Sequence, residues 1–328
     1  MHRDRTIGIA MLTIASLAWG TTGTAATFAP GVGPLAIGAA ALGIGGILQA
    51  LIALPQLRAN RHELRARAGI VMFGAIAVAI YPLAFYSSMH FAGVAIGSVV
   101  SLASAPIASG LLERLVDGTG LGPWWWFAVG LGIIGSAALC ASRATMSTGS
   151  FLETTTGVAL GLAAGASYAA YSWSSYRLMR AGVGRAASMG AVFGLGGMLL
   201  MPVLALTGAP IFESPGNMAV AAYMALVPMF LGYVLFGVAL TRVSASTATT
   251  VTLLEPAIAT VLAVLIVGER LGPLGWAGLG CIAIVLVVLT LAPGAESATT
   301  NTAARTTAEP ASRAASVRSS AAAPAPPR

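Results

Sequence analysis

The chain has 328 residues, of which 57% are hydrophobic and only 8% are charged. Soluble domains carry about 25% charged residues, so this composition excludes a soluble globular protein and predicts an integral membrane protein. The formal net charge of +7 comes from arginine alone, because the sequence holds no lysine. Without lysine there is no Walker A loop, which excludes ATP-driven transport by this chain. The charge balance gives no indication of a nucleic-acid partner.

Apolar segments of about 20 residues follow one another along the chain, separated by short polar links. A helix of this length crosses the ~30 Å hydrocarbon layer of a bilayer. We therefore predict an all-α integral membrane protein with ten transmembrane helices. The ten predicted spans are Ile7–Thr27, Pro34–Leu54, Gly69–Ser88, Gly93–Leu112, Pro123–Ala141, Gly157–Trp173, Ser188–Leu206, Met218–Ala239, Ala245–Val267 and Pro273–Ala292.

Arginine is distributed unequally among the links. With residues 1–6 in the cytoplasm, eleven arginines fall in cytoplasmic links and two, Arg143 and Arg270, fall in outer links. This bias predicts a multi-pass protein of the cell membrane with both termini cytoplasmic. Residues 293–328 are rich in alanine, threonine, serine, proline and arginine, which predicts a disordered cytoplasmic tail.

The sequence contains an internal repeat. Pro106 and Pro256 are 150 positions apart (256 − 106), and the same offset relates several other identical residues. These are Gly122-Pro123 with Gly272-Pro273, Trp126 with Trp276, Gly130 with Gly280, and Ala95 with Ala245. Each predicted repeat, residues 7–145 and 155–292, holds five spans. Because five is odd, the second repeat enters the membrane inverted, as in many secondary transporters.

Glu255 is a carboxylate in the middle of the ninth span, about 15 Å from its start. Intramembrane ionisable residues commonly belong to functional sites, and burial favours the neutral acid. Pro256 follows it and lacks an N–H, which predicts a bend and frees the carbonyl of Thr252. Its counterpart Pro106 follows an alanine, so the first repeat lacks the charge. We predict a substrate-binding or proton-coupling site; the alternative is a carboxylate that serves helix packing.

Hydroxyl side chains lie on two predicted helices close to these prolines. Thr249 and Thr252 share a helix face with Glu255, and Ser101 and Ser104 share a face of the fourth span. They could present hydroxyls to a polar solute. Small and hydroxyl residues also let membrane helices pack closely, and the pattern does not separate these readings.

Aromatic residues form a third group of candidates. Trp19 lies in the first span, and Tyr168 and Tyr171 lie on one side of the sixth. Aromatic walls could hold a substrate by apolar contact or by cation–π attraction, whereas packing or an interfacial belt is the alternative. Weaker candidates of the same kind are Tyr81, Tyr86 and Tyr233.

The second repeat, LLEPAIATVLAVLIVGERLGPLGWAGLGCIAIVLVVL at Leu253–Leu289, resembles the drug/metabolite transporter superfamily, in particular its ten-span EamA family. SAPIASGLLERLVDGTGLGPWWWFAVGLGIIG, at Ser104–Gly135, is similar to a diverged copy of the same pattern, and SLAWGTTGT at Ser16–Thr24 to the start of the family's first span. The resemblance covers about Ile7–Ala292. It implies an inner-membrane carrier, often an exporter of amino acids or related metabolites.

Enzymatic alternatives lack the residues that they need. The two aspartates, Asp4 and Asp117, are not deep in a span, and the three histidines form no zinc-binding motif. We therefore expect no catalytic residues, cofactor or metal, and a protein that is not an enzyme.

The sequence predicts a secondary active transporter that exports small amphipathic metabolites by alternating access, with proton coupling through Glu255. Its expected partners are a small-molecule substrate, the lipid bilayer and protons, without nucleic acid. Glycines of the fifth span would serve a homodimer or packing within one chain. The alternatives are an importer of a small metabolite and a receptor or scaffold without flux.

Overall fold

The computed structural model describes residues 2–26, 28–143, 151–262 and 272–291. Within these ranges the regular secondary structure is entirely helical, in agreement with the all-α prediction. Arg270, one of the two arginines in the predicted outer links, and the predicted tail, residues 293–328, lie outside the described residues.

The N-terminal half of the chain forms one series of helices, several of which are broken into shorter pieces. In chain order these are α1 (His2–Gly20), α2 (Thr22–Ala26), α3 (Pro34–Gly38), η1 (Ala39–Ile44), α4 (Gly45–Ile52), α5 (Leu54–Ala59), α6 (Arg61–Ala66), α7 (Ala68–Ala92), α8 (Val94–Val116) and α9 (Pro123–Arg143).

The C-terminal half forms a second series. Its described elements are α10 (Phe151–Arg180), α11 (Arg185–Thr207), η2 (Ala209–Glu213), α12 (Pro215–Met224), η3 (Ala225–Leu231), α13 (Gly232–Leu240), α14 (Ala245–Val251), α15 (Leu254–Leu262) and α16 (Pro273–Leu291).

Six helical stretches are long and apolar enough to cross a membrane: Arg3–Ala26, Pro34–Ile52, Ala68–Ala92, Ile96–Val116, Arg185–Thr207 and Pro215–Leu240. Helices also cover the other four predicted segments, as α9, α10, the α14–α15 pair and α16. The apolar stretch of α16, Pro273–Leu289, is shorter than the six. The structure thus agrees with a membrane protein, while the count of ten spans stays a prediction.

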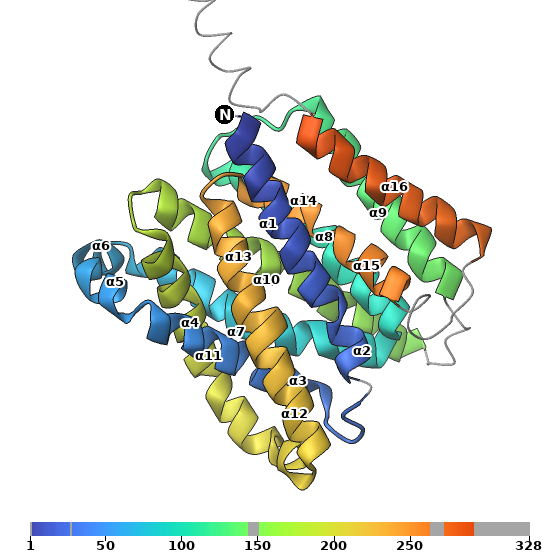
Figure 1. Cartoon of the computed structure of the whole chain (residues 1–328), viewed down its shortest axis with the longest axis horizontal. Helices are drawn as coiled ribbons and strands as arrows, with labels where there is room; N and C mark the ends of the chain where they lie inside the picture. The colour runs from blue at the N-terminus through green and yellow to red at the C-terminus, as the bar shows by residue number, and fades with distance from the viewer. Residues whose placement is uncertain (1, 27, 144–150, 263–271, 292–328) are drawn as a thin grey trace, which may run out of the picture.

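The helices pack into one bundle, in which α7, α8, α10 and α11 form much of the centre (Figure 1). Helix α1 lies against α13 and α15, so the chain's first helix packs on helices of the other half. Helices α9 and α16 lie side by side at the edge of the bundle (Figure 1). Glycines allow close approach at the centre: a Cβ on Gly165 of α10 would press on the Ser101 carbonyl oxygen of α8.

Three of the long helical segments depart from regular α-helix where they pass the centre. The stretches η1 and η3 are π-helical, and η3 contains Pro228, which supplies no N–H. Between α14 and α15, Pro256 likewise cannot continue the ladder, so the helix is interrupted at Thr252 and Leu253. The interruption lies where the bend was predicted. The predicted free carbonyl is absent, because the Thr252 oxygen accepts a hydrogen bond from the Glu255 N–H at 3.0 Å.

Candidate functional site

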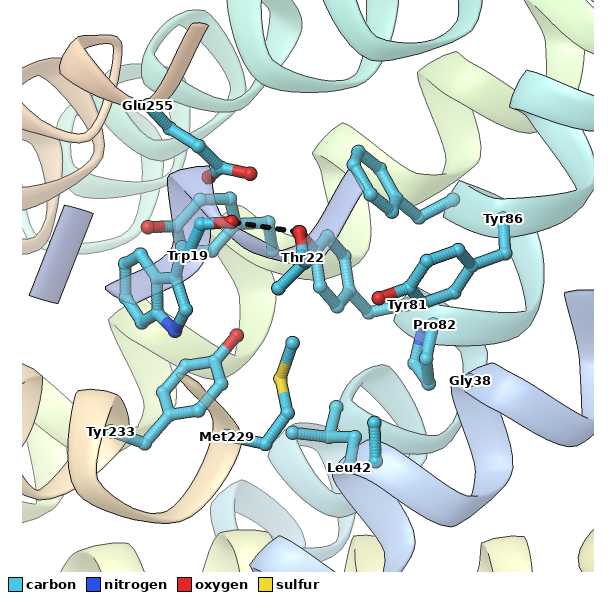
Figure 2. A pocket seen from close by; sticks show the side chains of 13 residues that line it. Trp19, Thr22, Gly38, Leu42, Tyr81, Pro82, Tyr86, Met229, Tyr233 and Glu255 are labelled. Atoms are coloured by element: carbon cyan, nitrogen blue, oxygen red, sulfur yellow. Dashed lines mark hydrogen bonds between the residues drawn. The ribbon is translucent and has the colours of Figure 1, made fainter. Parts of the chain in front are cut away.

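A pocket lies where the two halves of the chain meet (Figure 2). The N-terminal half contributes residues of α1, α2, α3, η1 and α7, and the C-terminal half contributes residues of α10, η3, α13 and α15. Its cavity volume is about 20 Å³, which is room for about one water molecule. The lining residues are Trp19, Thr22, Gly38, Ala41, Leu42, Tyr81, Pro82, Phe85, Tyr86, Tyr168, Met229, Tyr233 and Glu255.

Aromatic rings form most of the pocket wall. The ring centroids of Trp19 and Tyr233 are 4.9 Å apart, and those of Tyr81 and Tyr168 are 5.5 Å apart. Tyr171 stacks on Tyr168 at 5.2 Å. These spacings fit tilted and offset ring contacts, so the wall is a continuous aromatic cluster contributed by both halves of the chain.

Hydrogen bonds hold this cluster in place. The Trp19 indole N–H donates to the Pro228 carbonyl oxygen at 2.8 Å, which joins α1 to η3. The Tyr168 hydroxyl donates to Thr252 Oγ1 at 2.9 Å, and the Tyr171 and Tyr233 hydroxyls are 2.6 Å apart. The aromatic side chains are therefore fixed by polar contacts between helices as well as by packing.

Glu255 is the carboxylate of the pocket. It lies in the first turn of α15, directly after the interruption caused by Pro256, and its side chain points into the space bounded by Trp19, Thr22 and Tyr81 (Figure 2). Among the described residues, no hydrogen-bond donor or basic group is paired with this carboxylate. A half-buried acid without a partner in an apolar pocket is available to a proton or to a ligand.

The predicted hydroxyl residues lie around the pocket and do not line it. Thr252 accepts the Tyr168 hydrogen bond and donates to the Thr249 carbonyl oxygen at 2.9 Å. Thr249 donates to the carbonyl oxygens of Ala245 and Ser246. Both threonines are fully buried. Thr252 holds the Tyr168 hydroxyl, and Thr249 accepts the hydrogen bond of Thr252.

The predicted residues of α8 are further removed from the pocket. Ser101 donates to the Gly97 carbonyl oxygen at 2.7 Å, and Ser104 donates to the Ser101 carbonyl oxygen at 3.3 Å. Pro106 lies within the same helix and Pro256 within α15, and neither lines the pocket. Tyr171 lies one helical turn from the pocket wall and reaches it through Tyr233.

Sequence reasoning omitted several residues of the pocket. Leu42, Phe85 and Met229 carry no polar group, and their apolar side chains are indistinguishable in sequence from core or lipid-facing residues. Gly38 packs closely against α7, since a Cβ at this position would lie only 3.0 Å from the Pro82 carbonyl oxygen. The place of Gly38 in the pocket wall follows from this packing of α3 against α7, which the sequence does not show.

Glu113 is a second buried carboxylate that the sequence did not single out. It lies near the end of α8 and accepts hydrogen bonds from the Ser246 N–H at 2.9 Å and the Ser246 hydroxyl at 2.6 Å. Ser246 lies in the first turn of α14, where backbone N–H groups have no partner within the helix. Glu113 therefore caps α14 and ties the two halves of the chain together, away from the pocket.

The part of the chain that the structure describes contains no group of three His, Cys, Asp or Glu side chains arranged to hold a metal ion. The chemistry of the pocket is thus that of aromatic rings, hydroxyls and one carboxylate.

Comparison with known proteins supports a membrane carrier. The model of the EamA-like transporter family matches residues 6–140 and again residues 155–291. The chain is 33% identical over 281 residues to "Uncharacterized transporter YwfM" of Bacillus subtilis, across 85% of this chain and 92% of that protein. It is also 42% identical over 81 residues to "Uncharacterized transporter" of Clostridium kluyveri, across 24% of this chain and 26% of that protein.

A solved crystal structure shares the fold, with a TM-score of 0.71 over 87% of this chain and 96% of that chain, at 18% identity. A membrane-embedded helical bundle built from two copies of one unit, with a pocket between the copies, defines a membrane transporter. The chain belongs to the EamA-like transporter family. This membership favours a carrier over an enzyme and implies a small-molecule substrate.

Proposed function

We propose that this protein is a secondary active transporter that exports small amphipathic metabolites, the class that includes amino acids and their relatives. The pocket between the two family copies is its substrate site. The observation that carries the proposal is the unpaired Glu255 carboxylate in that pocket, with walls from both copies. A site at the interface between repeats is the arrangement that alternating access requires, because rocking one repeat against the other exposes it to each side in turn.

The proposal includes the topology expected from the sequence. Residues 7–145 and 155–292 are two five-helix repeats of inverted orientation, and both termini are cytoplasmic in the cell membrane. With this orientation, Thr22, Gly38 and Tyr86 place the pocket nearer the outer end of the bundle. Glu113 and Ser246 then close the cytoplasmic end. This contact must open when the pocket turns to the cytoplasm.

Glu255 is proposed to couple transport to protons. Apolar and aromatic surroundings favour the neutral acid, and substrate binding or contact with water favours the carboxylate. A carrier that protonates Glu255 on one side and releases the proton on the other couples solute flux to the proton gradient. Thr249, Thr252, Ser101, Ser104, Pro106 and Pro256 are then assigned to holding the helices around the site.

Metabolite release tests the proposal. Cells expressing wild type, Glu255→Gln or Glu63→Gln at matched membrane levels are loaded with dipeptides and metabolite mixtures, and the medium is followed by mass spectrometry. Glu63 is exposed on α6, which makes it a control for loss of a carboxylate. We expect wild type and Glu63→Gln to release a defined set of solutes above empty cells and Glu255→Gln to release none of it.

Equal release by wild type and Glu255→Gln would retain the carrier and remove Glu255 from its mechanism. Release by neither, together with uptake of a solute in the same cells, would identify an importer. If neither release nor uptake exceeded that of empty cells, the transporter proposal would give way to a receptor or scaffold.

A further inference from the structure

Charge in the pocket has one sign. Glu255 is the only lining residue with a carboxyl or basic group, and the lining includes no arginine or histidine. The sequence has no lysine at all. A ligand that brings a positive charge therefore meets an unpaired carboxylate, and a ligand that brings a negative charge meets no counter-charge among the lining residues.

The aromatic rings of the pocket strengthen its preference for a positively charged ligand. A cation over the face of an indole or phenol ring gains about 0.5 to 2 kcal/mol, depending on how dry the site is. Trp19 and Tyr233 line the same pocket as Glu255, and their ring centroids are 4.9 Å apart (Figure 2). The six aromatic lining residues are Trp19, Tyr81, Phe85, Tyr86, Tyr168 and Tyr233.

Three hydrogen-bond donors in the wall are already engaged. The Trp19 N–H donates to Pro228, the Thr22 hydroxyl donates to the Trp19 carbonyl oxygen at 2.7 Å, and the Tyr168 hydroxyl donates to Thr252. The Tyr171 and Tyr233 hydroxyls share one hydrogen bond, which either of them can donate.

Among the described lining side chains, the donors left to a ligand are neutral phenol hydroxyls, such as that of Tyr81. A hydrogen bond from a neutral hydroxyl offsets only part of the desolvation of a substrate carboxylate, which costs several kcal/mol when the carboxylate has no partner.

From the carboxylate, the ring faces and the engaged donors together, we propose that the pocket selects small organic cations. Its ligand is an amine or quaternary ammonium compound on an apolar body, without a free carboxylate. This rests on the proposed transport function and narrows its substrate class, since it places amines and carboxyl-blocked amino acids ahead of free amino acids. The ammonium lies between Glu255 and the rings of Trp19 and Tyr233. The cavity of about 20 Å³ must widen to admit the body.

A series of ligands with one aromatic body and different charges tests the proposal. The full chain is purified in detergent, and binding of radiolabelled phenethylamine, a cation, is measured by scintillation proximity. Phenylalanine methyl ester, phenylalanine and 3-phenylpropionate then compete as cation, zwitterion and anion. We expect the ester to compete like phenethylamine and phenylalanine to need at least about a tenfold higher concentration, which corresponds to ~1.4 kcal/mol. We expect phenylpropionate not to compete.

Variants locate the binding. Glu255→Gln is expected to weaken phenethylamine binding by at least about tenfold, and the surface control Glu63→Gln to leave it unchanged. If Glu255→Gln fails to fold, competition by the ligand series in the wild-type protein still tests the proposal. Competition by phenylalanine equal to that of its ester, competition by phenylpropionate, or absence of phenethylamine binding would each overturn the proposal. Unchanged binding in a folded Glu255→Gln would do so too.

Transport measurements separate this inference from the proposed function. Counterflow of phenylalanine without counterflow of phenethylamine would leave the carrier intact and overturn the cation class. Binding of phenethylamine without counterflow of any member of the series would support the cation site and count against the carrier.

Discussion

Removal of the Glu113 side chain should destabilise the protein more than removal of any exposed carboxylate. Glu113 is 4% exposed and accepts two hydrogen bonds from Ser246, at 2.9 and 2.6 Å. Hydrogen bonds to charged groups contribute about 1.5–3 kcal/mol each. Glu113→Ala also leaves the buried Ser246 N–H unpaired, while the Ser246 hydroxyl keeps Ser244 Oγ as a partner at 3.0 Å. We expect Glu113→Ala to lower the free energy of unfolding by about 3 kcal/mol.

Unfolding of the purified protein in mixed detergent micelles, titrated with sodium dodecyl sulfate and followed by circular dichroism, measures this loss. Glu113→Gln keeps an acceptor for the Ser246 N–H and should lose about half as much. Glu63→Ala, an exposed position of α6, should change the free energy by less than about 0.5 kcal/mol. A loss below ~1 kcal/mol for Glu113→Ala would refute the view that this carboxylate holds α8 and α14 together.

Two further substitutions examine the packing around the pocket and its closed end. A Cβ on Gly232 would lie 2.7 Å from the Trp19 indole nitrogen, so Gly232→Ala should displace the indole and weaken phenethylamine binding several-fold. Gly130→Ala, where a Cβ meets nothing within 4 Å, should leave that binding unchanged, and equal effects of the two would contradict the packing argument. Asp117 accepts a hydrogen bond from the Trp173 indole at 2.7 Å and forms an ion pair with Arg177. Asp117→Ala should therefore cost about 1 to 2 kcal/mol of unfolding free energy in the same titration. An unchanged unfolding midpoint would show that neither contact of Asp117 contributes to stability.

The fold class followed from the sequence because apolar segment length reports directly on a bilayer. Long regular helices such as α7 and α11 lie where the apolar runs predicted them. The π-helical stretches η1 and η3 were not predicted, since Ala39–Ile44 and Ala225–Leu231 read as ordinary apolar helix. Pro228 gave a hint at one of them, but its carbonyl matters only because Trp19 of a distant helix donates to it.

The candidate site was partly predictable. Glu255, Trp19 and Tyr168 attracted attention as polar or aromatic groups at intramembrane depth, and the structure brings all three to one pocket. Helical periodicity placed Thr249 and Thr252 on the face of Glu255, but it could not show that their hydroxyls bond to backbone and to Tyr168. Single-helix periodicity cannot tell which neighbour covers a face.

The burial of Glu113 could not be predicted from the sequence either. In GLLERLVD it reads as a charge in the link after the fourth span. Its burial depends on the start of α14, more than 100 residues later, which supplies both hydrogen-bond donors. Contacts of this kind join residues of the two copies that are far apart in the chain, so no local sequence pattern predicts them.

Counterflow in proteoliposomes tests the central claim most directly. Wild type and Glu255→Gln are reconstituted in equal amounts, and uptake of a radiolabelled solute from the release experiment is measured against an internal excess of the same solute, with and without an imposed pH gradient. The account predicts saturable counterflow by wild type that responds to the gradient. It predicts that Glu255→Gln has lost either counterflow or its response to the gradient. Full, gradient-sensitive counterflow by a folded Glu255→Gln would contradict the assignment of the pocket carboxylate to transport.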